Sequence, residues 1–350
     1  MKLFLRIISA YQGRKRQSTM ESLPGPVEST PTPPTPSIIR TIFLGANGIR
    51  AGWRFLIFAV LVVFFEAEVR VGLRHVPTLG RMLKEAQNGT LTPSFTLVFE
   101  SAALVAIILV CAIMAKIEKR PLGTYGIPLQ GAFGKLFWQG VLWGLAAETA
   151  VIGLIYALRG FSFGTIALSG VVLVKCAVVW ALAFVLVGLF EEFTFRGYPQ
   201  FTLTTGMGFW PSAVLLSALF GGVHLDNSGE GWVGALSVML FGLFACFTLR
   251  RTGNLWFAIG LHAAADYAET FIYSVPDSGL RATGHLLNSS FHGPRWLTGG
   301  TIGPEGSVMS FTVYLLSFVV FAWLYPTKKA NLRNGSVPPL QSLEHPVLTR

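Results

Sequence analysis

Apolar residues along this 350-residue chain occur in long runs that polar segments interrupt only at intervals. Several runs reach the length of about 20 residues that a helix needs to cross the hydrocarbon core of a bilayer. We therefore expect an all-α protein, a polytopic transmembrane helical bundle of about eight helices. The predicted spans lie near residues 52–69, 96–116, 135–158, 166–190, 210–224, 232–250, 254–274 and 307–325.

The composition agrees with a membrane protein, since 52% of the residues are apolar and only 13% are charged. Ordinary soluble domains carry about 25% charged residues. The net charge of +10 lies mostly in short connections and tails, where the positive-inside rule explains it, so we expect no nucleic-acid partner. The three cysteines fall inside apolar spans without the spacing of a disulfide framework or metal site.

The distribution of Lys and Arg predicts the orientation. An integral protein of the cytoplasmic membrane with both termini cytoplasmic would keep most basic residues inside. The main contrary feature is a basic group in the first outer loop, made of Arg70, Arg74, Arg81 and Lys84.

Breaks in the apolar pattern suggest five regions. Pro, Ser and Thr dominate residues 21–37, which favours an extended tether over a packed segment. The predicted regions are a basic N-terminal segment and tether (1–37), N-terminal transmembrane helices (38–118), a catalytic membrane core (119–275), a loop with the last transmembrane helix (276–327) and a disordered basic tail (328–350).

Ionisable residues inside apolar spans usually mark a functional site or an internal pair. The first set, Glu191, Glu192 and Arg196, ends a long apolar run. Because residues four apart share a helix face, Glu192 and Arg196 are predicted to form an ion pair, while Glu191 is turned about 100° away and stays free. The alternative is a helix end with solvated charges at the membrane interface.

Two further sets follow along the chain. Phe220 and His224 lie at the end of one apolar run, and His262 and Asp266 lie four apart in another. Taken alone, a histidine at the position of His224 is more often a packing residue than a catalyst. The His262–Asp266 pair fits a functional site and a buried histidine oriented by a carboxylate equally well.

Helix geometry predicts that these sets meet. At 1.5 Å per residue, Glu191 and His224 lie at a similar depth, about 20–25 Å from the turn near 205–209. The next turn, at 250–254, falls on the same side and places His262 about 12 Å or more into the following helix. The helix that ends at His224 is short, and the irregular segment after it is predicted to line a cavity that admits water.

This set of residues suits hydrolysis of a peptide bond. Glu191 would act as the general base on a water that His224 also holds, and His262 would stabilise the oxyanion. A zinc-dependent version is equally consistent, because Glu191, His224 and His262 supply three ligands and leave a fourth position for water. The sequence does not choose between these two versions. It lacks HExxH, the commonest zinc-protease motif, and it also lacks the GxSxG motif of a serine mechanism.

The ordered motifs EExxxR, FxxxH and HxxxN or HxxxD resemble those of the CPBP family, which comprises CaaX proteases and bacteriocin-processing (Abi) proteins. The resemblance covers roughly residues 120–275. It implies an intramembrane endopeptidase, similar to CaaX prenyl proteases, that acts on a peptide or a lipid-modified protein at the membrane lipid. The site residues it implies are Glu191, Glu192, Arg196, His224, His262 and Asp266.

In the resemblance, the first Glu is the base, the first His shares its water and the last pair forms the oxyanion site. Asp266 departs from the more usual Asn, and its charge suits orienting His262 better than donating to an oxyanion. Two other functions remain as alternatives. One is a non-catalytic scaffold or bacteriocin-immunity protein with the same fold, and the other is a transporter, which would require inverted repeats that the sequence does not display.

Four other polar residues receive structural interpretations. Glu148 and Lys175 are expected to form an ion pair between adjacent spans. Asp226 and Glu230 flank the irregular segment after His224, where a solvated loop is favoured over a cation site.

Overall fold

The helices of the computed structural model, which describes residues 42–45 and 48–326, follow the predicted apolar runs. They are α3 (Ala51–Arg74), α5 (Pro93–Glu118), α6 (Lys135–Ala157), α7 (Gly170–Arg196), α9 (Phe209–His224), α10 (Trp232–Thr252), α11 (Trp256–Tyr267), which continues into the π-helix η2 (Ala268–Ile272), and α13 (Val308–Leu324). The all-α class is therefore confirmed. The tether and tail predicted at 1–37 and 328–350 lie outside the described residues.

Shorter elements join these helices. The helical ones are α4 (Pro77–Gln87), η1 (Leu122–Tyr125), α8 (Tyr198–Met207), α12 (Arg295–Thr298) and η3 (Pro304–Gly306). Six two-residue strands pair as β1 (Leu44–Gly45) with β2 (Gly48–Ile49) and β4 (Phe161–Ser162) with β6 (Ser290–Phe291), both antiparallel, and β3 (Thr90–Leu91) with β5 (Arg281–Ala282), parallel. The chain divides into the units Met1–Ile42 and Phe43–Arg350, and the second holds all of these elements.

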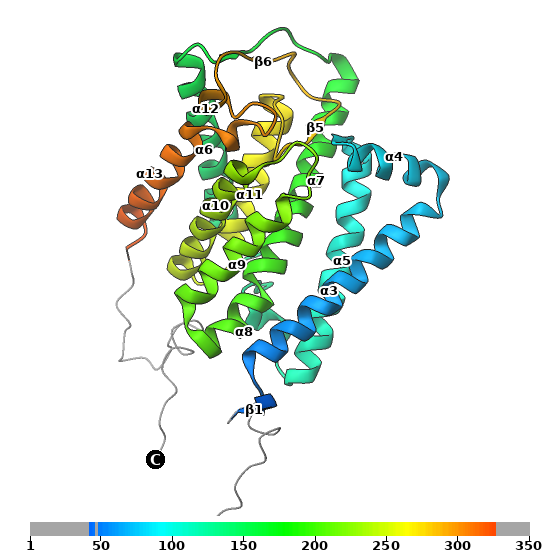
Figure 1. The fold of residues 1–350 in the computed structure, drawn as a ribbon, viewed down its shortest axis with the longest axis vertical. Helices are drawn as coiled ribbons and strands as arrows, with labels where there is room; N and C mark the ends of the chain where they lie inside the picture. The colour runs from blue at the N-terminus through cyan, green and yellow to red at the C-terminus, as the bar shows by residue number, and fades with distance from the viewer. Residues whose placement is uncertain (1–41, 46–47, 327–350) are drawn as a thin grey trace, which may run out of the picture. The chain divides into compact units, whose positions relative to one another are not determined.

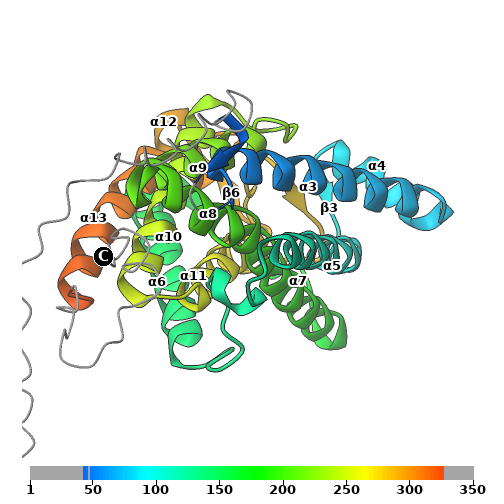
Figure 2. The same ribbon diagram turned by 90° about the horizontal axis from the view of Figure 1, so that it is seen from below.

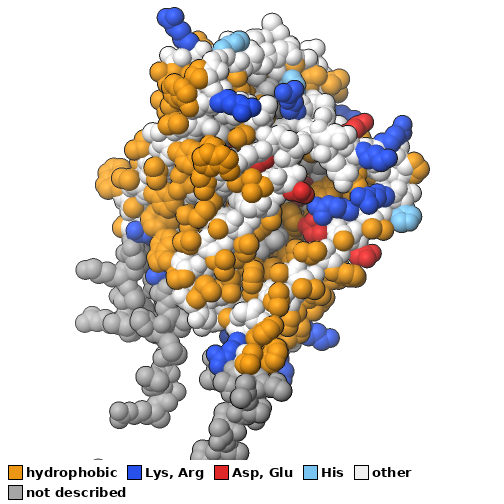
Figure 3. Space-filling model, viewed as in Figure 1, with side chains coloured by type: hydrophobic (Ala, Val, Ile, Leu, Met, Phe, Trp, Pro, Cys, Tyr) orange, Lys and Arg blue, Asp and Glu red, His pale blue; other side chains and the backbone are white. Residues whose placement is uncertain are grey.

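The outer surface of the bundle suits a lipid environment. Within residues 42–45 and 48–326, four helical segments can cross a membrane by length and composition, namely α5, α6, Gly170–Met207 and α10, and α9 and α13 are shorter apolar helices. Hydrophobic side chains cover most of the face shown in Figure 3. Large apolar side chains such as Val63, Leu142 and Trp323 are more than 60% exposed. The chain is therefore an integral membrane protein.

Helix α11 lies within the bundle, against α6, α7 and α10 (Figure 2). Two glycines on α6, Gly140 and Gly144, permit this packing, because a methyl group on either would overlap a backbone carbonyl oxygen of α11, from Phe257 or Leu261. Small residues let two helix backbones approach closely where lipid supplies no hydrophobic driving force. The close contact fixes the height and rotation of α11.

The two ends of the bundle are closed differently (Figure 1). At the end that holds α8, Glu118 of α5 accepts hydrogen bonds from Tyr198 and pairs with Arg54 of α3, with 2.8 Å between Arg54 Nη1 and Glu118 Oε2. At the other end, the loop from 276 to 306 packs over the segment after α9, where Asn227 Nδ2 donates to the Ser278 carbonyl at 3.0 Å.

Candidate active site

The end of α7 carries a fully buried ion pair. Arg196 Nη1 donates to Glu192 Oε1 at 3.1 Å, and both side chains are 0% exposed. The Phe220 ring of α9 packs against the guanidinium, with 4.0 Å between Arg196 Cζ and the ring centroid. The predicted Glu192–Arg196 pair is confirmed, and the interpretation as a solvated helix end is wrong for these two residues.

His262 of α11 is held by the same carboxylate. An ionised carboxylate only accepts hydrogen bonds, so His262 Nδ1 donates to Glu192 Oε1, at 2.9 Å. The Phe220 and Phe241 rings contact the imidazole with centroid distances of 6.0 and 5.0 Å. Glu192 thus orients the imidazole through Nδ1, while the Nε2 side of the ring faces Asp266, with 3.6 Å between His262 Nε2 and Asp266 Oδ2.

Glu191 has the opposite environment to Glu192. Its side chain is 23% exposed, and its Oε2 lies 3.5 Å from His262 Nε2. Although buried, this oxygen has no hydrogen-bond partner among the described residues. Asp266 Oδ2 lies 3.6 Å from the same nitrogen, His262 Nε2. Glu191 is thus turned away from the Glu192–Arg196 pair, as predicted, and lies within ion-pair distance of His262 without a hydrogen bond.

His224, at the end of α9, presents one nitrogen to the site. Its Nδ1 donates to the carbonyl oxygen of Phe220 at 2.7 Å, so the neutral imidazole has its lone pair on Nε2. The ring lies 4.7 Å from the Phe220 centroid and close enough to Glu191 for their charges to interact. No hydrogen bond joins His224 to Glu191 or His262 in the described structure.

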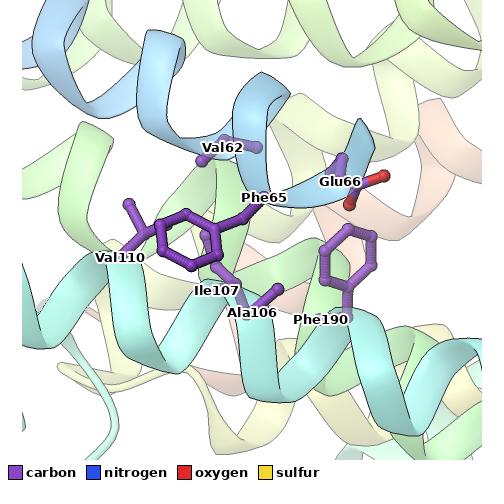
Figure 4. A pocket seen from close by; sticks show the side chains of 7 residues that line it. All are labelled: Val62, Phe65, Glu66, Ala106, Ile107, Val110 and Phe190. Atoms are coloured by element: carbon purple, nitrogen blue, oxygen red, sulfur yellow. The ribbon is translucent and has the colours of Figure 1, made fainter. Parts of the chain in front are cut away.

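Sequence reasoning missed two further acidic residues near Glu191. Glu66 of α3 and Glu100 of α5 both lie near enough to interact with its charge. Figure 4 shows the Glu66 side chain beside Phe190 of α7 in a small pocket between α3 and α5. Arg70 pairs with Glu66, with 3.3 Å between Arg70 Nη1 and Glu66 Oε2. Glu66 and Glu100 could have been found from the sequence, because both are ionisable residues inside apolar runs, the criterion that selected Glu191.

The zinc alternative was tested against the positions of the ligand atoms. In the described parts of the chain, the one group of three or more acidic, His or Cys ligands with atoms within 4.8 Å of one another is Glu269, Asp277 and Glu305. Glu191, His224 and His262 do not form such a group, and His262 Nδ1 is engaged by Glu192. In this structure the three side chains do not converge on one point, and the zinc version stays a prediction from the sequence.

Glu148 and Lys175 do not form the expected ion pair. Within the described residues Glu148 pairs with no cation, and its Oε1 is buried without a hydrogen-bond partner. Lys175 is exposed on the surface of α7. Glu148 is therefore buried and Lys175 exposed. Their equal distance along the sequence from the 158–169 connection predicted a similar depth but not the direction of either side chain.

Comparison with known proteins places the site in a family. Residues 173–268 match the family model described as type II CAAX prenyl endopeptidase Rce1-like. No curated protein and no solved structure gives a significant match. The matched segment runs from α7 to the end of α11 and includes all six predicted site residues, from Glu191 to Asp266. The match to the Rce1-like family model of CAAX prenyl endopeptidases over residues 173–268 is consistent with the resemblance to CPBP proteins.

Proposed function

We propose that the protein is an intramembrane endopeptidase in which Glu191 activates water for attack on a peptide bond. The observation that carries this proposal is the contrast between the neighbouring carboxylates of Glu191 and Glu192. Glu192 is locked by Arg196 and His262, whereas Glu191 is partly exposed and keeps an oxygen without a partner. A general base needs such a free, partly desolvated carboxylate within reach of water.

The steps balance with residues of the chain alone. Glu191 takes a proton from water, and the resulting hydroxide attacks the carbonyl carbon of the scissile bond. His224 Nε2 accepts a hydrogen bond from the same water. The tetrahedral oxyanion receives a hydrogen bond from His262 Nε2–H, which Glu192 orients through Nδ1. When the C–N bond breaks, the proton on Glu191 passes to the leaving amine.

The substrate that fits this proposal is a peptide or lipid-modified protein segment that enters from the membrane. The family match points to prenylated CAAX sequences as the first candidates. The apolar outer surface of α9, where Val214 and Val223 are about half exposed, offers lipid-side contact next to His224.

The test is cleavage of a quenched peptide library that includes prenylated CAAX peptides by the purified protein. We expect Glu191→Gln to reduce turnover by about 10²- to 10⁴-fold. Glu68→Gln, which removes an exposed carboxylate of α3, should leave turnover unchanged. Cleavage that persists at the wild-type rate in Glu191→Gln contradicts this assignment of the base.

A second arm addresses the metal. 1,10-Phenanthroline binds zinc strongly and calcium weakly, so inhibition by this chelator followed by recovery with Zn²⁺ would support the zinc version. Unchanged cleavage in its presence supports water activation by Glu191 alone.

A further inference from the structure

Three carboxylates outside the proposed catalytic set meet at the end of α11. Glu269 comes from η2, Asp277 from the loop that follows, and Glu305 from η3. One oxygen of each lies within 4.8 Å of the others. Since 36 residues of chain separate Glu269 from Glu305, tertiary folding brings them together.

Glu269 is the buried member of this group. It is 4% exposed, and its Oε1 has no hydrogen-bond partner in the described structure. Gly303, with φ of +106°, passes directly beside it: a methyl group there would lie 3.1 Å from Glu269 Oε1 and would overlap the Pro276 carbonyl oxygen. The carboxylate oxygen without a hydrogen-bond partner therefore lies near a second acceptor, the Pro276 carbonyl.

The other two carboxylates are held in place by hydrogen bonds. Thr270 Oγ1 donates to Asp277 Oδ2 at 2.9 Å. The backbone N–H and Oγ of Ser278 both donate to Glu305 Oε2, at 2.8 and 2.7 Å. These neutral donors fix the positions of the carboxylates without cancelling their charge. No Lys or Arg forms an ion pair with any of the three among the described residues.

The surroundings add negative charge. Glu148 and Asp266 interact with Glu269, and Glu230 interacts with Glu305. Buried charges are ordinarily paired or bound to a metal, because removing them from water is unfavourable. The charge of His262 acts on Asp277 without forming an ion pair with it, and no described Lys or Arg pairs with the three carboxylates, which leaves a cation to be provided from solution.

We propose that Glu269, Asp277 and Glu305, together with the Pro276 carbonyl, form a Ca²⁺ site. All of the candidate ligands are oxygen atoms, which excludes the nitrogen and sulfur preference of zinc. Ca²⁺ accepts six to eight oxygen ligands from carboxylates, carbonyls and water in flexible geometry, whereas Mg²⁺ requires near-ideal octahedral geometry. Ligands on η2, a loop and η3 match the more flexible ion.

The bound ion would clamp the loop from 276 to 306 onto the helix that carries His262 and Asp266. With the orientation predicted from the sequence, this loop faces the non-cytoplasmic side. Calcium sites of extracellular modules have dissociation constants of about 10⁻⁴–10⁻³ M, and we expect this site to fall in that range.

The experiment is calcium titration of the full-length protein in detergent after removal of divalent ions with EGTA. Isothermal titration should detect one Ca²⁺ per chain. The melting temperature should rise by at least about 3 °C at 10 mM Ca²⁺. The same concentration of Mg²⁺ should give a clearly smaller shift. An equal response to both ions, or no saturable binding of Ca²⁺, overturns the proposal.

Variants separate metal binding from a purely structural role. Glu305→Gln and Asp277→Asn keep the size of the side chain and its hydrogen-bond acceptor, so both should fold and bind Ca²⁺ at least tenfold more weakly. In EGTA they should melt at or above the wild-type temperature, because one repulsive charge is gone. Glu85→Gln, on the exposed face of α4, should respond to Ca²⁺ like the wild type. A wild-type Ca²⁺ response in both site variants contradicts the assignment.

Discussion

At the scale of single residues, Glu192 joins two parts of the site through one oxygen atom. Its Oε1 accepts hydrogen bonds from Arg196 Nη1 on its own helix and from His262 Nδ1 on α11. The carboxylate is 0% exposed, so its charge depends on these two donors. In the proposed mechanism, Glu192 and Arg196 are therefore positioning residues, which act through His262 rather than on the substrate.

Removal of Arg196 should leave that charge buried without its main partner. We expect Arg196→Gln to lower the free energy of unfolding by about 3–5 kcal/mol, the usual penalty for breaking a buried ion pair from one side. Denaturation in mixed micelles, followed by tryptophan fluorescence, measures this change. The double variant Arg196→Gln, Glu192→Gln should recover part of the loss. Arg74→Gln, an exposed control on α3, should have little effect.

An equal loss in the single and double variants would contradict this account, because the penalty would then come from packing around Phe220 and not from the unpaired charge.

The residue contacts that sequence predicted are those within one helix. The spacing of four fixed the Glu192–Arg196 pair and turned Glu191 away from it. The hydrogen bond from His262 to Glu192 spans 70 residues and depends on the rotation of α11, which spacing alone does not determine. Glu66 and Glu100 carried the same signal as Glu191, but their nearness to it results from the packing of α3 and α5.

At the scale of elements, the contact of α6 with α11 sets the position of His262. Gly144 faces the backbone of α11 at Leu261, one residue before His262, and Gly140 faces Phe257 one turn earlier. The depth of His262 relative to Glu191 is thus fixed by a close backbone contact rather than by the loop before α11.

A methyl group at position 144 should separate these helices. Gly144→Ala would overlap the Leu261 carbonyl oxygen, and it should lower stability by about 1–3 kcal/mol as other overpacked sites do. A displacement of His262 by about 1 Å should reduce kcat by about 10²-fold. Gly153→Ala on the same helix, where no atom lies within 4 Å of the added methyl group, is the matched control.

Gly153→Ala should keep wild-type kcat and change stability by less than about 1 kcal/mol. A similar loss of kcat in both variants would mean that α6 does not position the site through Gly144.

The apolar runs predicted the long helices because length in the membrane is imposed by the bilayer. They did not predict α4, α8, η2 or the short strands. The helical path breaks at Gly197, between α7 and α8, and Pro199 lies in the first turn of α8. The loop from 276 to 306 is held by contacts with β3 and with the segment after α9, which are distant in sequence.

At the scale of the whole membrane unit, Phe43–Arg350, the two ends carry different chemistry. One end has the Arg54–Glu118 pair and the connection that includes η1, and the other has the acidic group at Glu269, Asp277 and Glu305. Acidic and basic side chains also appear amid the hydrophobic ones near the middle of the face in Figure 3. The direction in which the unit is inserted decides which compartment meets the acidic group.

The basic connections predict that the end with η1 is cytoplasmic, and single cysteines test this orientation. Arg120→Cys lies before η1 and Arg281→Cys lies in β5, and both side chains are exposed. The background replaces Cys176 with Ala, since Cys111 and Cys246 are buried. In intact cells, an impermeant maleimide should label Arg281→Cys and should label Arg120→Cys only after the membrane is opened. The reverse pattern would place the acidic group in the cytoplasm, where free calcium is too scarce to fill a site of about 10⁻⁴–10⁻³ M affinity.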